Sequence, residues 1–198
     1  MDCAACHIAG GTKARGGSFV GLYARFPQWN KRSHRMIALQ DRIAECFLRS
    51  ENGHPPAYTS RAMIAVVAYI AWLSRGTQAF SKEPSAQRFI VALPTASPDP
   101  VRGARLFAQR CALCHGANGA GSAAFPPLWG NLSFNTGAGM SHVKMMTGFV
   151  YYNMPKNAPG TLSLRDAYDI ASFVLSHKRP VFRENAPVHF PPQPAGYF

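Results

Sequence analysis

The sequence predicts an all-α protein made of two small tandem domains. A short motif, two cysteines separated by two residues and followed by histidine, occurs at Cys3–His7 and again at Cys111–His115. A glycine-rich stretch follows each copy, and segments with the apolar period of a helix come next. The alternation of apolar and polar residues typical of strands persists nowhere in the 198 residues.

Five segments carry the predicted helices. Asp99-Pro100 has the form of a helix start, with an acid as cap and proline in the first turn, and that helix leads to the second motif. Residues 141–151 form a short helix and residues 164–175 a closing one. In the first half, helices are expected at 39–49 and 60–74. No helix precedes the first motif, so we expect the native chain to begin further upstream, with an export signal.

Proline-containing segments divide the chain. We predict an N-terminal domain at 1–76, a linker at 77–98, a C-terminal domain at 99–179 and an extended proline-rich tail at 180–198.

Composition restricts the class of protein. The formal charge of +12 suits an anionic partner, but zinc-finger spacing, a basic heptad helix and RNA-binding motifs are all missing, which argues against nucleic acid. The longest apolar run, 63–73, is too short for a transmembrane segment. Four of the five cysteines belong to the two motifs, and the fifth is Cys46.

The repeated motif predicts covalent haem c. Its two thiols can bond to the two vinyl groups of a porphyrin, and the histidine that follows can reach the iron. We therefore expect two haem c groups, attached through Cys3, Cys6, Cys111 and Cys114, with His7 and His115 as proximal iron ligands. The architecture would be two tandem class I cytochrome c-like domains. Because haem is attached to this motif outside the bacterial inner membrane, we expect a periplasmic protein.

The second ligand of each iron follows from spacing. Met154 lies 39 residues past His115 in an Asn-Met-Pro loop, and Cys46 lies 39 residues past His7. Met140, Met145 and Met146 compete with Met154, although core packing is the ordinary explanation for the latter pair. Cys46 could equally be a buried free cysteine. With a thiolate on the first iron and a thioether on the second, electrons would move from the first haem to the second.

A basic region surrounds Cys46. It contains Arg25, Lys31, Arg32, Arg35, Arg42 and Arg49. On a helix, Arg42 would share the face of Cys46, and Ser50 would extend a polar rim. Guanidinium groups match the oxygens of a multi-oxygen anion. A solvated basic face is the competing interpretation.

The first domain resembles the dihaem thiosulfate dehydrogenases of bacteria. The resemblance is densest over 2–75. It rests on Cys3-Ala-Ala-Cys6-His7-Ile-Ala-Gly-Gly-Thr12, Phe26-Pro27, Asp41-Arg42-Ile43, Cys46-Phe-Leu-Arg49-Ser50-Glu-Asn52-Gly53 and Val67-Ala-Tyr69-Ile-Ala-Trp72-Leu-Ser74. The second domain fits, but its motif and Asn-Met-Pro are shared by many cytochromes.

The resemblance implies an activity and a set of site residues. Two thiosulfates would be coupled to tetrathionate, and a small cytochrome c would accept the electrons. Cys46 would ligate the active-site haem, Met154 the second one, and Arg32, Arg42 and Ser50 would bind substrate. Some members carry a lysine that exchanges at the iron where this chain has Asn153, which puts such a switch in doubt.

Three other functions remain open from the sequence. The chain could be a tetrathionate reductase working in the reverse direction, a non-catalytic electron-transfer subunit, or a subunit that joins thiosulfate to a carrier protein. The set Arg32, Arg42, Cys46 and Ser50 favours an enzyme, because a conduit for electrons needs none of these residues.

Overall fold

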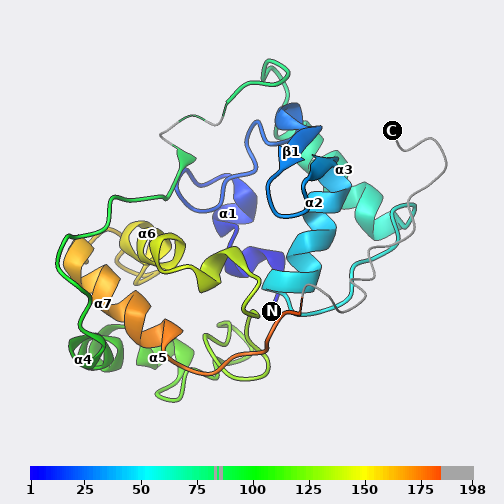
Figure 1. The fold of residues 1–198 in the computed structure, drawn as a ribbon. Coiled ribbons are helices and arrows are strands. Elements are labelled where there is room, and N and C mark those ends of the chain that lie inside the picture. Colours follow the sequence, from blue (N-terminus) through cyan, green and yellow to red (C-terminus); the bar gives the residue numbers. More distant parts are fainter. Residues whose placement is uncertain (83, 85–86, 184–198) are drawn as a thin grey trace.

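Two helical units lie side by side in the computed structural model, which describes residues 1–82, 84 and 87–183 (Figure 1). The first unit contains the short helices η1 (Cys3–Ala5), α1 (Ile8–Gly11) and η2 (Tyr23–Arg25), the strands β1 (Gln28–Asn30) and β2 (Arg35–Ile37), and the helices α2 (Leu39–Glu45), η3 (Cys46–Ser50) and α3 (Arg61–Trp72). The second contains α4 (Pro100–Arg110), α5 (Ala112–His115), η5 (Gly139–Ser141), α6 (Val143–Asn153) and α7 (Leu164–Leu175). Most of the predicted tail, residues 184–198, lies outside the described residues.

Local capping signals start the helices of the second unit. The Asp99 side chain accepts hydrogen bonds from the backbone N–H groups of Val101 and Arg102, both at 2.9 Å, and so caps α4 as predicted. Ser163 caps α7 through the backbone of Asp166, whose carboxylate bonds back to Ser163. The predicted helix 164–175 is confirmed at both ends.

A close crossing of α4 and α7 forms the frame of this unit. A Cβ at Gly103 would lie 2.1 Å from the carbonyl oxygen of Asp169, so only glycine allows this approach. The core next to the crossing is apolar. It contains Phe107, Phe134, Ala138, Met146, Val150, Leu162, Ala167, Ile170, Ala171 and Val174.

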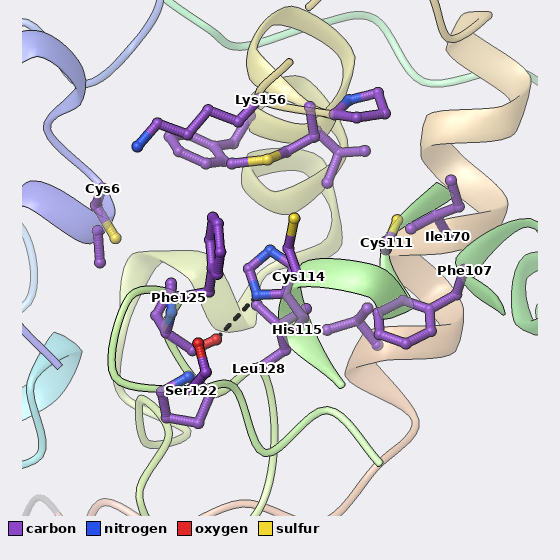
Figure 2. A pocket seen from close by; sticks show the side chains of 18 of the residues that line it. Cys6, Phe107, Cys111, Cys114, His115, Ser122, Phe125, Leu128, Lys156 and Ile170 are labelled. Atoms are coloured by element: carbon purple, nitrogen blue, oxygen red, sulfur yellow. Dashed lines mark hydrogen bonds between the residues drawn. The ribbon is translucent and has the colours of Figure 1, made fainter. Parts of the chain in front are cut away.

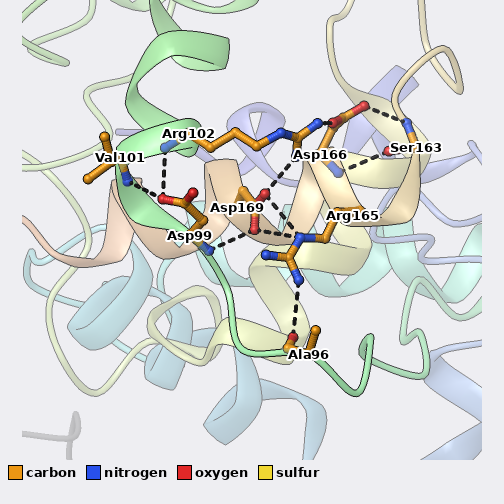
Figure 3. Close-up of polar contacts among 8 residues, drawn as sticks. All are labelled: Ala96, Asp99, Val101, Arg102, Ser163, Arg165, Asp166 and Asp169. Atoms are coloured by element: carbon orange, nitrogen blue, oxygen red, sulfur yellow. Dashed lines mark hydrogen bonds and ion pairs between the residues drawn. The ribbon is translucent and has the colours of Figure 1, made fainter.

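A buried carboxylate links the two crossing helices (Figure 3). Asp169 is 0% exposed. It accepts a hydrogen bond from the Asp99 backbone at 2.9 Å, pairs with Arg102 at 2.6 Å and pairs with Arg165 at 3.1 Å. Arg102 also pairs with Asp166, and hydrogen bonds from Ser163 and Arg102 hold the pKa of that carboxyl below its ordinary value despite the opposing effect of burial. The start of α4 is therefore fixed to α7 by charge as well as by packing.

The first unit packs α2 against α3. Its buried residues are Leu39, Ile43, Tyr58, Met63 and Ile70, with Phe19, Leu22, Phe26 and Phe47 packed around them. Asp41, also 0% exposed, accepts hydrogen bonds from the Tyr58 hydroxyl at 2.7 Å and from the Ala38 backbone at 3.0 Å. These bonds fix the start of α2, which leads directly to Cys46.

Two predictions for this unit were wrong in detail. The chain is helical, but a short antiparallel hairpin pairs Gln28 with Ile37 and Asn30 with Arg35. Strands of three residues are too short to show an alternating pattern. The expected single helix at 39–49 is α2 followed by a π-helical turn, η3, which begins at Cys46.

The two units are joined by polar contacts as well as by the chain. The Asn153 amide donates hydrogen bonds to the Arg15 carbonyl at 2.7 Å and to the Phe149 carbonyl at 3.1 Å. The Arg15 guanidinium lies over the Tyr152 ring, 4.4 Å from its centroid. The N-terminus lies where the units meet, and Met1 packs against the core of the second unit. Within the described residues, no helix combines the length and apolarity needed to cross a membrane.

We predict that Asp169→Asn lowers the free energy of unfolding of the second unit by roughly 2 to 4 kcal/mol, because two arginines lose a buried partner. Urea unfolding followed by circular dichroism of the haem-loaded chain measures this loss. Asp99→Asn is the matched control, since asparagine caps a helix as well as aspartate does. Equal stability of Asp169→Asn and the parent chain would show that the ion pairs do not stabilise the crossing.

Candidate haem sites and their surroundings

A large cavity lies in the second unit, on the side that meets the first unit (Figure 2). Its volume is about 830 Å³. Protein interiors normally leave few voids larger than a water molecule, so a hole of this size marks the place of a bound group. The lining is mainly apolar, from residues such as Phe107, Leu128, Phe134, Phe149, Val150, Ile170 and Val174. Cys111, Cys114, His115 and Met154 also line it.

His115 is oriented for metal binding. Its Nδ1–H donates to the Pro126 carbonyl at 2.9 Å, which leaves Nε2 as the ligand atom (Figure 2). Burial lowers the pKa of His115, which favours the neutral imidazole that can bind iron.

Methionine sulfurs are available in the same cavity. Met154 follows the last residue of α6 with an extended backbone and lines the cavity. Met140 and Met146 line it too, and Met146 is buried in the core. The structure thus places the predicted ligand and two of its competitors around one cavity.

His7 repeats this arrangement in the first unit. Its Nδ1–H donates to the Gly17 carbonyl at 2.5 Å, and its ring stacks on Phe19 with the centroids 4.1 Å apart. Burial is the main cause of its lowered pKa, and the charge of Arg42 adds to it. In both histidines of the repeated motif, burial therefore favours the neutral imidazole, and a backbone carbonyl fixes the ring.

Cys46 lies near the first motif. Burial raises the pKa of the Cys6 thiol to about 12, and the electrostatic interaction with Cys46 contributes next. The pKa of the Cys3 thiol is raised to about 12 as well, chiefly by burial and by its hydrogen bond to Glu51. The electrostatic interaction with Cys46 is a smaller cause. The fifth cysteine therefore lies within electrostatic reach of both attachment cysteines.

Arg42 stands beside Cys46, as the sequence predicts. The charge of Cys46 is the largest cause of the raised pKa of Arg42, followed by the opposing effect of burial and the favourable charge of Glu45. The guanidinium donates to a Glu45 carboxylate oxygen at 3.1 Å, while 43% of the Arg42 side chain remains exposed. One cation thus lies next to the sulfur and in reach of solvent.

Glu45 is a residue that sequence reasoning missed. It is 3% exposed, and its second oxygen accepts from the Asn30 amide at 2.9 Å. The only sequence signal was its position three residues after Arg42, where a helix brings side chains together. Glu45 holds Arg42 in place but also neutralises part of its charge.

The other two predicted substrate residues lie differently. Arg32, in the hairpin turn, donates to the Gly137 carbonyl of the second unit at 3.1 Å. Ser50 is half-buried and ends the π-helical turn that Cys46 begins. Of the predicted substrate residues, Arg42 lies on α2 and Ser50 at the end of η3, whereas Arg32 lies in the hairpin turn and contacts the second unit.

The first motif also forms one wall of the cavity in the second unit. Ala4, Ala5 and Cys6 line that cavity, opposite the motif of the second unit, and Figure 2 shows Cys6 approaching it. Groups attached to the two motifs would consequently be neighbours.

Each unit thus offers two thiols, a neutral histidine and a sulfur donor, and the second adds an apolar cavity for a porphyrin. Helices arranged around such donor sets define a c-type cytochrome of two cytochrome c domains, with covalently bound haem c. A family model described as the SoxA/TsdA cytochrome c domain matches residues 1–79, and a cytochrome c model matches residues 100–178. Thiosulfate dehydrogenase of Allochromatium vinosum is 42% identical over 93% of this chain and 72% of its own length. The chain belongs to the thiosulfate dehydrogenase family.

Two further similarities support this family. Thiosulfate dehydrogenase of Stutzerimonas stutzeri is 37% identical over 91% of this chain. The solved structure of thiosulfate dehydrogenase (TsdBA) from Marichromatium purpuratum matches 94% of this chain with a TM-score of 0.87 and 31% identity. This chain spans 60% of the former and 42% of the latter.

We predict that Gly17→Ala disturbs the first haem site. Gly17 has a φ of +66°, and an added Cβ would lie 2.5 Å from the Cys6 carbonyl oxygen and 3.0 Å from Nδ1 of His7. We expect less haem per chain and an altered low-spin signal of the first iron, measured by pyridine haemochrome absorbance and electron spin resonance.

Gly76→Ala is the matched control. Gly76 has a φ of +77° with nothing within 4 Å of an added Cβ, so it tests backbone strain without a collision. We expect it to cost about 1 kcal/mol of stability and to leave both haem signals intact. Identical haem signals in the two variants would show that Gly17 does not hold His7.

Proposed function

We propose that this chain oxidises thiosulfate in the periplasm, coupling two thiosulfates to one tetrathionate with release of two electrons. The observation that carries the proposal is Cys46 beside Arg42 at the first haem-attachment motif, in a member of the thiosulfate dehydrogenase family. The reaction balances without protons, since two dianions give one dianion and two electrons.

The cofactors are two haem c groups, one on each motif. When bound, haem iron accepts and passes on single electrons, so two irons can take the two electrons of one turnover. His7 and Cys46 would ligate the first iron, and His115 and Met154 the second. A thiolate favours oxidised iron and a thioether favours reduced iron, which directs electrons toward the second domain.

Arg42 would offset the repulsion between the substrates. Two unit charges 4 Å apart repel by about 1 kcal/mol in water and by more in a partly buried site. The Arg42 guanidinium lies beside Cys46 with a large exposed fraction, so it can bind sulfonate oxygens while the sulfane sulfur points to Cys46. Arg32 and Ser50 would complete this anion site from the hairpin turn and from the end of η3.

The wall shared by the two sites supports short-range electron transfer. Cys6 attaches the first haem and lines the cavity of the second, so electrons need not pass through solvent. Asn153, which precedes Met154, donates its amide to two backbone carbonyls and serves as a link between domains. Because Asn153 is engaged in this way, we propose that Met154 is a constant ligand of the second iron. We also propose a small external cytochrome c as the electron acceptor.

Formation of tetrathionate tests this function directly. Haem-loaded chain, thiosulfate and ferricyanide should yield tetrathionate and two ferrocyanides for each tetrathionate. If the chain carries its full haem content but forms no tetrathionate, this result would support a non-catalytic electron-transfer subunit. Reduction of tetrathionate by reduced dye at a higher rate than the oxidation would identify the reverse reaction as the preferred one.

We predict that Cys46→Ala abolishes turnover and leaves both haems attached, because Cys3 and Cys6 are unchanged. Thiosulfate-dependent ferricyanide reduction measures the first effect, and haem content per chain measures the second. In oxidised protein at low temperature, electron spin resonance should lose the signal of a thiolate-bound haem. Activity like that of the parent chain would remove Cys46 from the mechanism.

We predict that Arg42→Ala raises the KM for thiosulfate about 10- to 100-fold, as expected for loss of a hydrogen bond to a charged group. The haem spectra should change little. Steady-state kinetics over a range of thiosulfate concentrations gives the value, and Arg61→Ala, at an exposed position on α3, controls for the loss of one positive charge.

The Arg42 variant also leaves Glu45 without its ion pair. In the double variant Arg42→Ala with Glu45→Gln, the KM should recover in part, since the repelling carboxylate is gone. An unchanged KM in Arg42→Ala would contradict the anion-binding role.

A further inference from the structure

The last carbonyl groups of the helix that carries Cys46 show how this helix is held. A helix leaves its final carbonyls without partners inside the helix. The Cys46 carbonyl accepts from the Glu51 N–H at 3.0 Å, and the Phe47 carbonyl accepts from the Gly53 N–H at 2.8 Å. Both bonds come from the residues directly after the π-helical turn, so the chain satisfies these two carbonyls locally.

The next two carbonyls receive their hydrogen bonds from the other domain. The Asn135 amide donates to the Leu48 carbonyl at 2.8 Å, and the Asn135 backbone N–H donates to the Arg49 carbonyl at 3.1 Å. The same amide donates to the Asn52 side-chain oxygen at 3.0 Å. Asn135 is 2% exposed, so water does not compete for these bonds.

Asn135 is itself fixed within the second domain. Its side-chain oxygen accepts from the Gly137 N–H at 3.0 Å, which closes a local turn. The Thr136 N–H between them donates to the Pro180 carbonyl at 2.9 Å. The Gly137 carbonyl in turn accepts from Arg32 at 3.1 Å. One three-residue segment, 135–137, thus contacts both the end of η3 and the hairpin of the first domain.

We infer that Asn135 is a positioning residue for the thiosulfate site, through which the second domain fixes the helix that presents Cys46. This inference rests on the proposed function, because it assumes that Cys46 is the iron ligand. The π-helical turn η3 is of a kind that occurs mostly as a single turn within an α-helix, frequently at functional sites. Asn135 donates to two consecutive carbonyls at its end, and the Gly137 carbonyl of the same segment accepts from Arg32. The catalytic domain is therefore complete only when the electron-accepting domain is docked on it.

The sharpest test is Asn135→Asp in the full, haem-loaded chain. Aspartate has the same shape and keeps the oxygen that accepts from Gly137, but it loses both amide donations and sets a carboxylate against the Leu48 carbonyl. Asn131→Asp introduces the same charge at an exposed position four residues earlier and is the matched control. Asn135→Ala is a second variant that removes the donor without adding charge.

We expect kcat to fall on the order of tenfold or more in both Asn135 variants, as for small displacements of a reacting group. The thiolate-type electron spin resonance signal of the first haem should broaden or shift, while the signal of the His/Met haem stays unchanged. The unchanged second signal also shows that the second domain has folded. Asn131→Asp should match the parent chain in every measurement.

Three results would separately contradict the positioning role of Asn135 or the ligation of iron by Cys46. Parent-like kcat and a parent-like thiolate signal in Asn135→Ala would refute the positioning role even if Asn135→Asp failed to fold. Loss of both haem signals in Asn135→Ala would show a general role in folding instead. A parent chain without any thiolate-type signal would overturn the proposed ligation by Cys46, and the positioning role with it.

Discussion

The helices of the second domain close around a cavity, and this constraint governs the rest of that domain. A volume of about 830 Å³ lies beside the core that α4, α6 and α7 share. Filling it with a flat apolar group adds the buried surface that a domain of this size lacks by itself. The covalent motif ensures that the filling group stays in place.

The two domains share the motif and the way its histidine is held, but they differ in the second sulfur donor. His7 and His115 are both held by a backbone carbonyl through Nδ1, so each leaves Nε2 available to bind iron. The difference lies in the second sulfur, a thioether in an extended loop at Met154 and a thiol at the start of a π-helical turn at Cys46. A loop can adjust to the iron, whereas a helix fixes its side chains in advance. That contrast suits a site where substrate sulfur has to meet a sulfur at a defined position.

Local signals allowed much of this structure to be predicted from the sequence. The haem motifs, the Asp99 cap and the Ser163 cap each lie within a few residues of the structure they produce, so the helices that follow were expected at their observed starts. The interval of 39 residues from His7 to Cys46 is not a local signal, and the ligation of iron by Cys46 stays a prediction. The hairpin and the π-helical turn have no sequence period of their own and were missed. Asn135 was missed because its partner Leu48 lies 87 positions away, and only the docked domains bring the two together.

Charge around Cys46 favours a proposed anion site that extends to the domain interface. Glu45 keeps Arg42 next to the sulfur, but it also cancels part of the positive charge that two dianions require. Additional positive charge therefore has to come from outside α2, and Arg32 is the residue of the hairpin that the second domain holds through Gly137. If the domains separated, Arg32 would lose this bond and the carbonyls at the end of η3 would lose theirs. Under the proposed function, docking of the second domain would thus be coupled to assembly of the anion site, so thiosulfate would bind well only where its electrons have an exit.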